Sequence, residues 1–479
     1  MAVLTNYEPK DVFRFFEELN AIPRGSFNTK EVSDYCVKFA KDRGLEVIQD
    51  KVDNVIIKKD GTKGYENSEP VIIQGHLDMV CEKTVDSTHD FMKDGLDLYV
   101  EDGFVKARNT TLGADDGIAI AYGLALLDSD TIPHPPLEML FTVDEEVGLG
   151  GAHAVDISSL KGKFLINIDS GDEEIILAGC AGGFRKSLVL DIKREEKEGS
   201  ILTIDLRDLK GGHSGGEIHI QRGNANKMLG RLLNHLNQNT EIRVVEYQGG
   251  TKDNVITANA AMSIWALDAK KAKELIKEME GIWLEEFEGA EPNMKLTVTE
   301  KNASTKVLTK ESSDKVICLL DCTPYGVQAM MRSIDGVVET SLNLGIALLE
   351  ENKFTISFSV RSALKSKLAM MQETLNACAT LVGAQTSLSG VYPPWLYKKD
   401  SKLRDIATKA YKDVSDKEPI VTVMHAGLEC GLLSDKKPDL DCISIGPNMF
   451  DIHSVDERLD IASTNRTWEF VKKILADCK

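Results

Sequence analysis

Short apolar segments that end in acidic or imidazole side chains are the part of this sequence that most restricts its fold. Between residues 70 and 168 such segments alternate with a helix-like segment, and the alternation returns near residue 440. The predicted strands are 70–74, 137–143, 164–168 and 440–445, and the predicted helix is 116–127. This alternation is typical of an α/β sheet, so we expect an α/β fold.

The middle of the chain follows a different pattern. Between about residues 185 and 392, polar alternating strands such as 200–205 and 353–360 accompany helices such as 224–237 and 365–382. This pattern indicates an α+β domain. A chain of 479 residues also exceeds what one hydrophobic core usually organises. We therefore predict a discontinuous first domain, residues 1–183 and 392–479, interrupted by an inserted domain of residues 184–391.

The charge balance limits the possible partners. The chain has 57 Lys and Arg against 76 Asp and Glu, a net charge of -19 that repels nucleic-acid phosphates and anionic membranes. Its longest nearly apolar run, 117–127, is far shorter than the roughly 20 residues that a membrane helix needs. No secretory signal is visible in residues 1–10, and the 9 cysteines include no C-x-x-C pair. These observations predict a cytoplasmic protein without nucleic-acid or membrane partners.

The segment VIIQGHLDMV places His76 and Asp78 directly after an apolar strand. Their spacing of two residues directs both side chains to one face. A histidine that binds zinc often donates its other ring N–H to a carboxylate, and Asp78 is placed for this role. Alone, the pair is more typical of a surface histidine beside an aspartate than of a metal site.

Two further segments carry neighbouring acids. TLGADDGIAIA has Asp115 and Asp116 where an apolar helical run begins, and helix capping accounts for only one of them. LFTVDEEVGLGGAH places three consecutive acids after a strand, where their charges repel each other unless a cation neutralises them. Of Glu145 and Glu146, one could bind metal while the other accepts a proton from water.

The last two candidate residues are Asp169, in FLINIDSGDE, and His453, in DIHSVDERLDI. Like the others, they follow predicted strands, and open α/β sheets bind ligands at the carboxyl ends of their strands. Two imidazoles and several carboxylates form a mixed N/O site of the kind that zinc accepts. The sequence contains neither the nucleotide-binding motif G-x-x-x-x-G-K-[ST] nor the serine hydrolase motif G-x-S-x-G.

Seven segments, in this order, resemble the family of di-zinc peptidases and deacylases, and within it the Xaa-His dipeptidases. They are GHLDMV, TLGADDGIA, DEEVGLGGA, NIDSGDE, GGHSGG, MHAGLECG and IGPNMFDIHSVDERL. The resemblance extends over nearly the whole chain. It implies two divalent metal ions per subunit, with zinc expected and cobalt or manganese as alternatives. It also implies a homodimer in which the inserted domain serves as lid and dimerisation surface.

The resemblance further implies a set of metal ligands. His76 and Asp169 are expected to bind one ion, Glu146 and His453 the other, and Asp115 to bridge the two. Asp116 is not the expected bridge, because the residue after the bridging aspartate varies in the wider family.

The remaining roles also follow from the resemblance. Glu145 is expected to be the general base and Asp78 to orient His76. In the inserted domain, His213 of GGHSGG is expected to stabilise the oxyanion, often in the partner subunit's active site. Substrate contacts are expected from Asn254, Arg361 and His425, with Arg361 suited to the carboxylate of a dipeptide.

Together these expectations predict a metallo-dipeptidase that hydrolyses Xaa-His and other unblocked dipeptides. In this hypothesis Glu145 deprotonates a water that bridges the two ions and later protonates the leaving amine. Two alternatives stay open: an N-acyl amino acid deacylase on the same scaffold, and a metal- or peptide-binding protein without catalytic activity.

Overall fold

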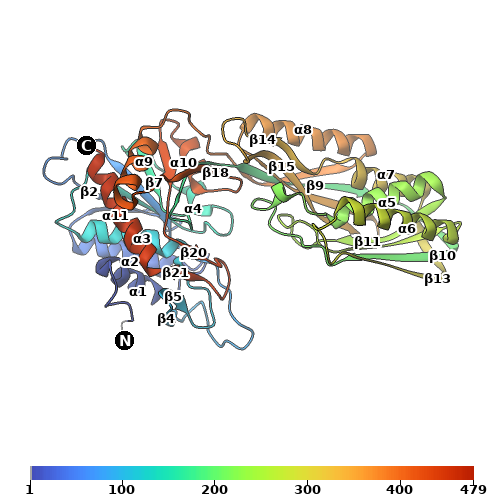
Figure 1. Cartoon of the computed structure of the whole chain (residues 1–479), viewed down its shortest axis with the longest axis horizontal. Coiled ribbons are helices and arrows are strands. Elements are labelled where there is room, and N and C mark those ends of the chain that lie inside the picture. Colours follow the sequence, from blue (N-terminus) through green and yellow to red (C-terminus); the bar gives the residue numbers. More distant parts are fainter. Residues whose placement is uncertain (1–2) are drawn as a thin grey trace. The chain divides into compact units, whose positions relative to one another are not determined.

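The computed structural model describes residues 3–479, which form two compact units (Figure 1). Unit 1 extends to Cys180 and continues in Trp395–Val423 and Leu428–Lys479, whereas unit 2 comprises Ala181–Pro394 and Met424–Gly427. The second unit thus interrupts the first, and the expectation of a mixed α/β fold is confirmed. The sequence did not predict that residues 424–427 return to unit 2.

Unit 1 is built on an 8-stranded sheet. Its strand order is β1 (Glu46–Gln49), β2 (Val55–Lys59), β6 (Leu137–Thr142), β3 (Val71–His76), β7 (Phe164–Asn167), β19 (Asp441–Ser444), β8 (Ile175–Cys180) and β18 (Ile420–Met424). The central strands β6, β3, β7 and β19 are parallel. Their carboxyl ends therefore meet at one edge of the sheet.

The two faces of this sheet differ in chemistry. Alternate residues such as Ile73, Phe141 and Ile166 belong to the main hydrophobic core. Helices contribute to the same core: α1 (Lys10–Asn20), α2 (Lys30–Asp42), α3 (Ala114–Asp128), α9 (Lys402–Ser415) and α11 (Ile461–Asp477). Toward the carboxyl ends of the strands, the intervening residues are polar but equally buried: Gln74, His76, Thr142, Asn167 and Ser444. Two short helices complete the unit, α4 (Gly150–Ala154) and α10 (Glu429–Lys436).

A second, 4-stranded sheet in unit 1 was not predicted. Its order is β20 (Met449–Phe450), β21 (Arg458–Asp460), β5 (Phe104–Ala107) and β4 (Leu98–Glu101). This sheet pairs a segment near the C-terminus with residues 98–107. The loop between β20 and β21 carries His453, so His453 is positioned by this small sheet rather than directly by β19.

Unit 2 contains a 9-stranded antiparallel sheet. Its order is β13 (Lys295–Leu308), β10 (Arg194–Arg207), β12 (Ala260–Ala266), β11 (Ile242–Gly249), β15 (Val338–Leu349), β16 (Lys353–Ser362), β9 (Gly182–Asp191) and β17 (Gln385–Tyr392), and β14 (Gly326–Met330) pairs with β15. Four helices cover one face (Figure 1): α5 (Ala225–Asn239), α6 (Ala269–Glu286), α7 (Lys310–Cys322) and α8 (Lys365–Val382). None of the helices in residues 3–479 is both long enough and apolar enough to cross a bilayer.

Candidate metal centre

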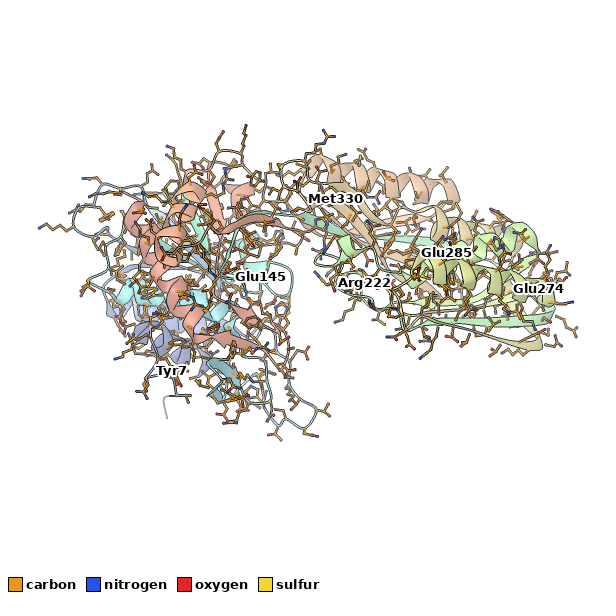
Figure 2. All side chains as sticks on the ribbon, viewed as in Figure 1. Tyr7, Glu145, Arg222, Glu274, Glu285 and Met330 are labelled. Carbon is orange, nitrogen blue, oxygen red and sulfur yellow. The ribbon has the colours of Figure 1, made fainter. Side chains whose placement is uncertain are left out.

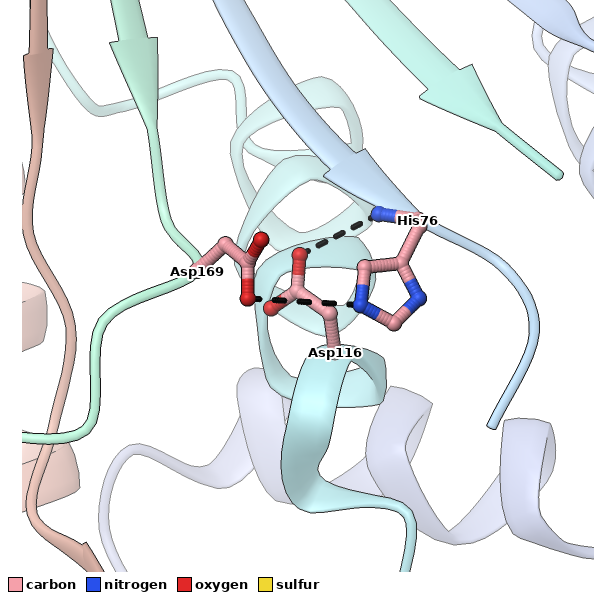
Figure 3. Close-up of side chains that lie close together, drawn as sticks. All are labelled: His76, Asp116 and Asp169. Atoms are coloured by element: carbon pink, nitrogen blue, oxygen red, sulfur yellow. Dashed lines mark hydrogen bonds and ion pairs between the residues drawn. The ribbon is translucent and has the colours of Figure 1, made fainter. Parts of the chain in front are cut away.

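His76 is the last residue of β3 and is buried at the carboxyl edge of the sheet. Its Nδ1 lies 3.1 Å from the backbone oxygen of Asp78, to which it can donate a hydrogen bond. Its Nε2 then faces two carboxylates, Asp115 Oδ1 at 3.0 Å and Asp169 Oδ1 at 4.0 Å. Figure 3 shows the imidazole and Asp169 approaching each other from the ends of neighbouring strands. This ring is oriented as a metal ligand commonly is.

Asp115 lies between the two histidines expected to bind metal. One of its oxygens is 3.0 Å from His76 Nε2, and the other is 3.1 Å from His453 Nε2. A carboxylate that offers one oxygen toward each imidazole is arranged as a bridge between two ions. His453 Nε2 also lies 3.0 Å from Glu146 Oε1, and the three side chains form one group of possible metal ligands.

Asp116 occupies a different position at the start of α3 (Figure 3). Its Oδ2 accepts a hydrogen bond from the backbone N–H of His76 at 3.1 Å, whereas its buried Oδ1 has no hydrogen-bond partner. Asp116 forms a possible ligand group with His76 and Asp169. The sequence assigned it no role, yet its unpartnered oxygen is available to a cation.

Asp78 connects the histidine of β3 to the two glutamates that follow β6. Its Oδ1 accepts a hydrogen bond from the backbone N–H of Glu145 at 3.0 Å and lies 3.4 Å from His76 Nδ1. Its Oδ2 accepts hydrogen bonds from the hydroxyl of Ser26 at 2.8 Å and from the backbone N–H of Glu146 at 3.4 Å. One buried carboxylate therefore orients both the imidazole and the glutamate segment.

Glu145 is the remaining acid of the centre. It lies in unit 1 (Figure 2) and forms a possible ligand group with His76 and Glu146. Burial raises the pKa of its carboxyl well above the usual range, and the charges of neighbouring carboxylates add to this effect. A raised pKa makes a carboxylate a stronger proton acceptor.

The electrostatics of the centre fit bound cations. Burial raises the pKa of Asp169 well above its usual range, and the charges of Asp115 and Asp116 raise it further. Hydrogen bonds to Asp115 and Glu146 raise the pKa of His453 to about 10. The centre therefore holds more negative charge than its own side chains neutralise. Imidazoles and carboxylates together suit zinc and related divalent ions.

Two buried charged residues hold the backbone around the centre, and sequence reasoning missed both. Arg24 donates from Nη1 to the backbone oxygens of Leu77 and Asp78, at 3.1 and 3.2 Å, and from Nη2 to the backbone oxygen of Gly113. Glu457 accepts backbone N–H groups of residues 112, 113 and 114 at 2.8, 3.0 and 2.8 Å. Both fix the segment that leads to Asp115.

The other four predicted site residues lie in unit 2. Arg361 is nearly buried and donates to the Tyr392 hydroxyl at 3.0 Å. His425 Nε2 is 2.7 Å from Ser341 Oγ, and burial together with the charge of Arg361 lowers the pKa of His425 to about 3. The backbone oxygen of Asn254 accepts the N–H of Ser214, which places Asn254 beside the loop of His213. Their roles in substrate binding stay predictions.

Comparison with known proteins identifies the family of the chain. The family model described as Peptidase family M20/M25/M40 matches residues 72–477. The chain belongs to this peptidase family. The resemblance inferred from the sequence motifs is thereby confirmed.

Individual members of the M20 family resemble the chain over its full length. The cytosol non-specific dipeptidase of Escherichia coli (strain K12) is 37% identical over 482 residues, which cover 100% of this chain and 99% of the relative. The structure of an aminoacylhistidine dipeptidase from Vibrio alginolyticus matches with a TM-score of 0.91 and 36% identity, covering 99% of this chain and 98% of the other. The aminopeptidase PepT from Bacillus cereus shares the fold, with a TM-score of 0.55 at 16% identity, covering 98% of this chain and 99% of the other.

Proposed function

We propose that this M20 peptidase hydrolyses unblocked dipeptides, including Xaa-His dipeptides, with the aid of two divalent metal ions. The observation that carries the proposal is the position of Asp115, whose two oxygens lie 3.0 and 3.1 Å from the Nε2 atoms of His76 and His453. The two full-length relatives, whose names describe dipeptidases, support the choice of substrate.

These contacts support the ligand assignment. His76 and Asp169 would hold one ion, Glu146 and His453 the other, and Asp115 both. Bound divalent ions would supply Lewis-acid polarisation of the peptide carbonyl and would lower the pKa of water. Zinc is the expected metal, because the donor set combines imidazole nitrogen with carboxylate oxygen, and cobalt or manganese would suit the same donors.

Glu145 acts as the general base. Its carboxyl is half-buried and has a raised pKa, so it accepts the proton of the attacking water and then transfers it to the leaving amine. Asp78 holds both the backbone of Glu145 and the ring of His76, which fixes the position of the general base relative to the metal ligand.

The residues of unit 2 recognise the substrate. Arg361 pairs with the dipeptide carboxylate, because a guanidinium can bind a carboxylate through two parallel hydrogen bonds. His213 stabilises the oxyanion, and Asn254 and His425 contribute further contacts. Unit 2 serves as lid and dimerisation surface of a cytoplasmic homodimer. The name of the Escherichia coli relative supports the cytosolic location, and light scattering would measure the oligomeric state.

Two neighbouring substitutions test the mechanism. Glu145→Ala should abolish dipeptide turnover while elemental analysis still finds the full metal content. Glu146→Ala, the matched variant, should lose both turnover and metal. Normal turnover in Glu145→Ala would refute the role of Glu145. A panel of dipeptides and N-acetyl amino acids, measured with a chelator control, tests the substrate class, and preferential hydrolysis of N-acetyl amino acids would contradict the proposal.

A further inference from the structure

Glu429 is a buried carboxylate near the metal centre that the proposed mechanism does not use. It is the first residue of α10 and has no exposed surface. Its Oε2 accepts hydrogen bonds from the side-chain amide of Gln74 and, at 2.6 Å, from the hydroxyl of Thr142. Its Oε1 is buried without a hydrogen-bond partner. A buried carboxylate left half-satisfied is costly, so its presence requires a physical reason.

The two donors of Glu429 belong to strands that carry the centre. Gln74 lies two residues before His76 on β3, so both side chains are on one face of the sheet. Thr142 is the register partner of His76 on the neighbouring strand β6. Gln74 also accepts a hydrogen bond from the Asn167 amide at 2.7 Å, and Asn167 lies two residues before Asp169. This network therefore links the ends of the strands that carry the ligands.

The charge of Glu429 also acts on the centre. Both of its hydrogen-bond donors are neutral, and burial raises the pKa of its carboxyl to about 7. Burial is the largest cause of the raised pKa values of Glu145 and Asp116, and the negative charge of Glu429 raises both pKa values further. Without metal, the negative charge of Glu429 is unfavourable, because it is repelled by the neighbouring carboxylates. With divalent cations bound nearby, the same charge is favourable, because unlike charges attract strongly in a buried environment.

We propose that Glu429 is a positioning residue of the metal centre. It holds the ends of β3 and β6 through Gln74 and Thr142, and it adds a buried negative charge that strengthens the binding of divalent metal ions. It is not itself a ligand. The inference rests on the proposed metal-dependent function and adds a residue outside the ligand set, contributed by a segment more than 350 positions along the chain from Gln74.

Two substitutions at Glu429 separate charge from packing. Glu429→Gln keeps the size and can accept both hydrogen bonds through its carbonyl oxygen but removes the charge. Glu429→Asp keeps the charge but shortens the side chain. Zinc affinity of the chelator-treated protein is measured by competition with a chromophoric chelator, and thermal unfolding is followed without metal. The Glu429→Gln variant should bind zinc about 10-fold more weakly or worse than the wild type and should melt at a higher temperature without metal. The Glu429→Asp variant should bind zinc more tightly than the Glu429→Gln variant.

Glu138 provides a matched control on the same strand as Thr142. It is also buried, but its carboxylate accepts backbone N–H groups of Lys161 and Gly162 at 2.9–3.0 Å. It lies at the other end of β6 from Thr142. Glu138→Gln should lower the stability of the metal-free protein and leave zinc affinity unchanged, because it disrupts satisfied hydrogen bonds away from the centre.

The outcomes distinguish this inference from the proposed function. Unchanged zinc affinity in Glu429→Gln, or a metal-free melting temperature that falls, would overturn the role of Glu429 while the dipeptidase proposal stands. Zinc binding that is weaker in Glu429→Asp than in Glu429→Gln would show that only packing matters and would also overturn it. If the wild-type protein binds no zinc and hydrolyses no dipeptide, the proposed function itself fails.

Discussion

Replacing Asp78 by Asn should weaken metal binding without unfolding the protein. The Asn side-chain oxygen can still accept the backbone N–H of Glu145, which Asp78 Oδ1 accepts at 3.0 Å. The Ser26 hydroxyl can rotate to accept from the new amide, and only the long 3.4 Å hydrogen bond from the Glu146 N–H is lost. The substitution does remove the negative charge 3.4 Å from His76 Nδ1, and this charge makes the imidazole a stronger ligand.

The expected loss can be estimated from comparable sites. Substitution of a carboxylate that orients a ligating histidine typically weakens metal affinity by about 10–100-fold, or about 1.4–2.7 kcal/mol. A competition titration of the metal-free protein with a chromophoric chelator measures this change. Ser26→Ala removes one hydrogen bond to Asp78 but keeps the charge, so its affinity should stay close to that of the wild type. Wild-type affinity in Asp78→Asn would refute the reasoning.

Three further predictions concern other parts of the chain. Arg24→Met leaves several buried backbone oxygens without their donor, so urea titration should show about 3 kcal/mol lower unfolding free energy, and an unchanged midpoint would contradict this. Arg361→Met should raise the KM for unblocked dipeptides about 10–100-fold in steady-state kinetics while metal content stays constant, and an unchanged KM would exclude carboxylate binding by Arg361. The pKa of His425 is lowered to about 3, so its stabilising effect is present above pH 6.5 and lost as pH falls toward 3. In metal-free protein, His425→Asn should flatten the dependence of melting temperature on pH in this window, and an unaltered slope would disprove the buried neutral histidine.

The sequence predicted the parts of the fold that rest on local patterns. The strands of the parallel core appeared as short apolar runs, and the side chains at their carboxyl ends could be expected to converge. In the structure, contacts of 3.0–3.1 Å join His76 to Asp115, Asp115 to His453, and His453 to Glu146. Local pattern was sufficient here because each candidate ligand lies at the end of a strand or helix or in the loop that follows.

Other parts depend on contacts that leave no local trace. β20 has only 2 residues, too few for any periodicity, so the small sheet that positions His453 was missed. Glu429 and Glu457 meet their partners across 355 and about 343 positions of the chain, respectively. In the sequence both are ordinary acids beside more conspicuous histidines. Their burial arises only when distant segments pack together.

We propose that His76, Asp115, Glu146, Asp169 and His453 hold two metal ions in unit 1. The most direct test is anomalous diffraction from crystals of the zinc-loaded protein, with data collected on both sides of the zinc absorption edge. We expect two peaks, one within coordination distance of His76, Asp115 and Asp169 and the other of Asp115, Glu146 and His453. Zinc-loaded crystals with no peak at these residues, or with zinc bound only elsewhere on the chain, would contradict the account.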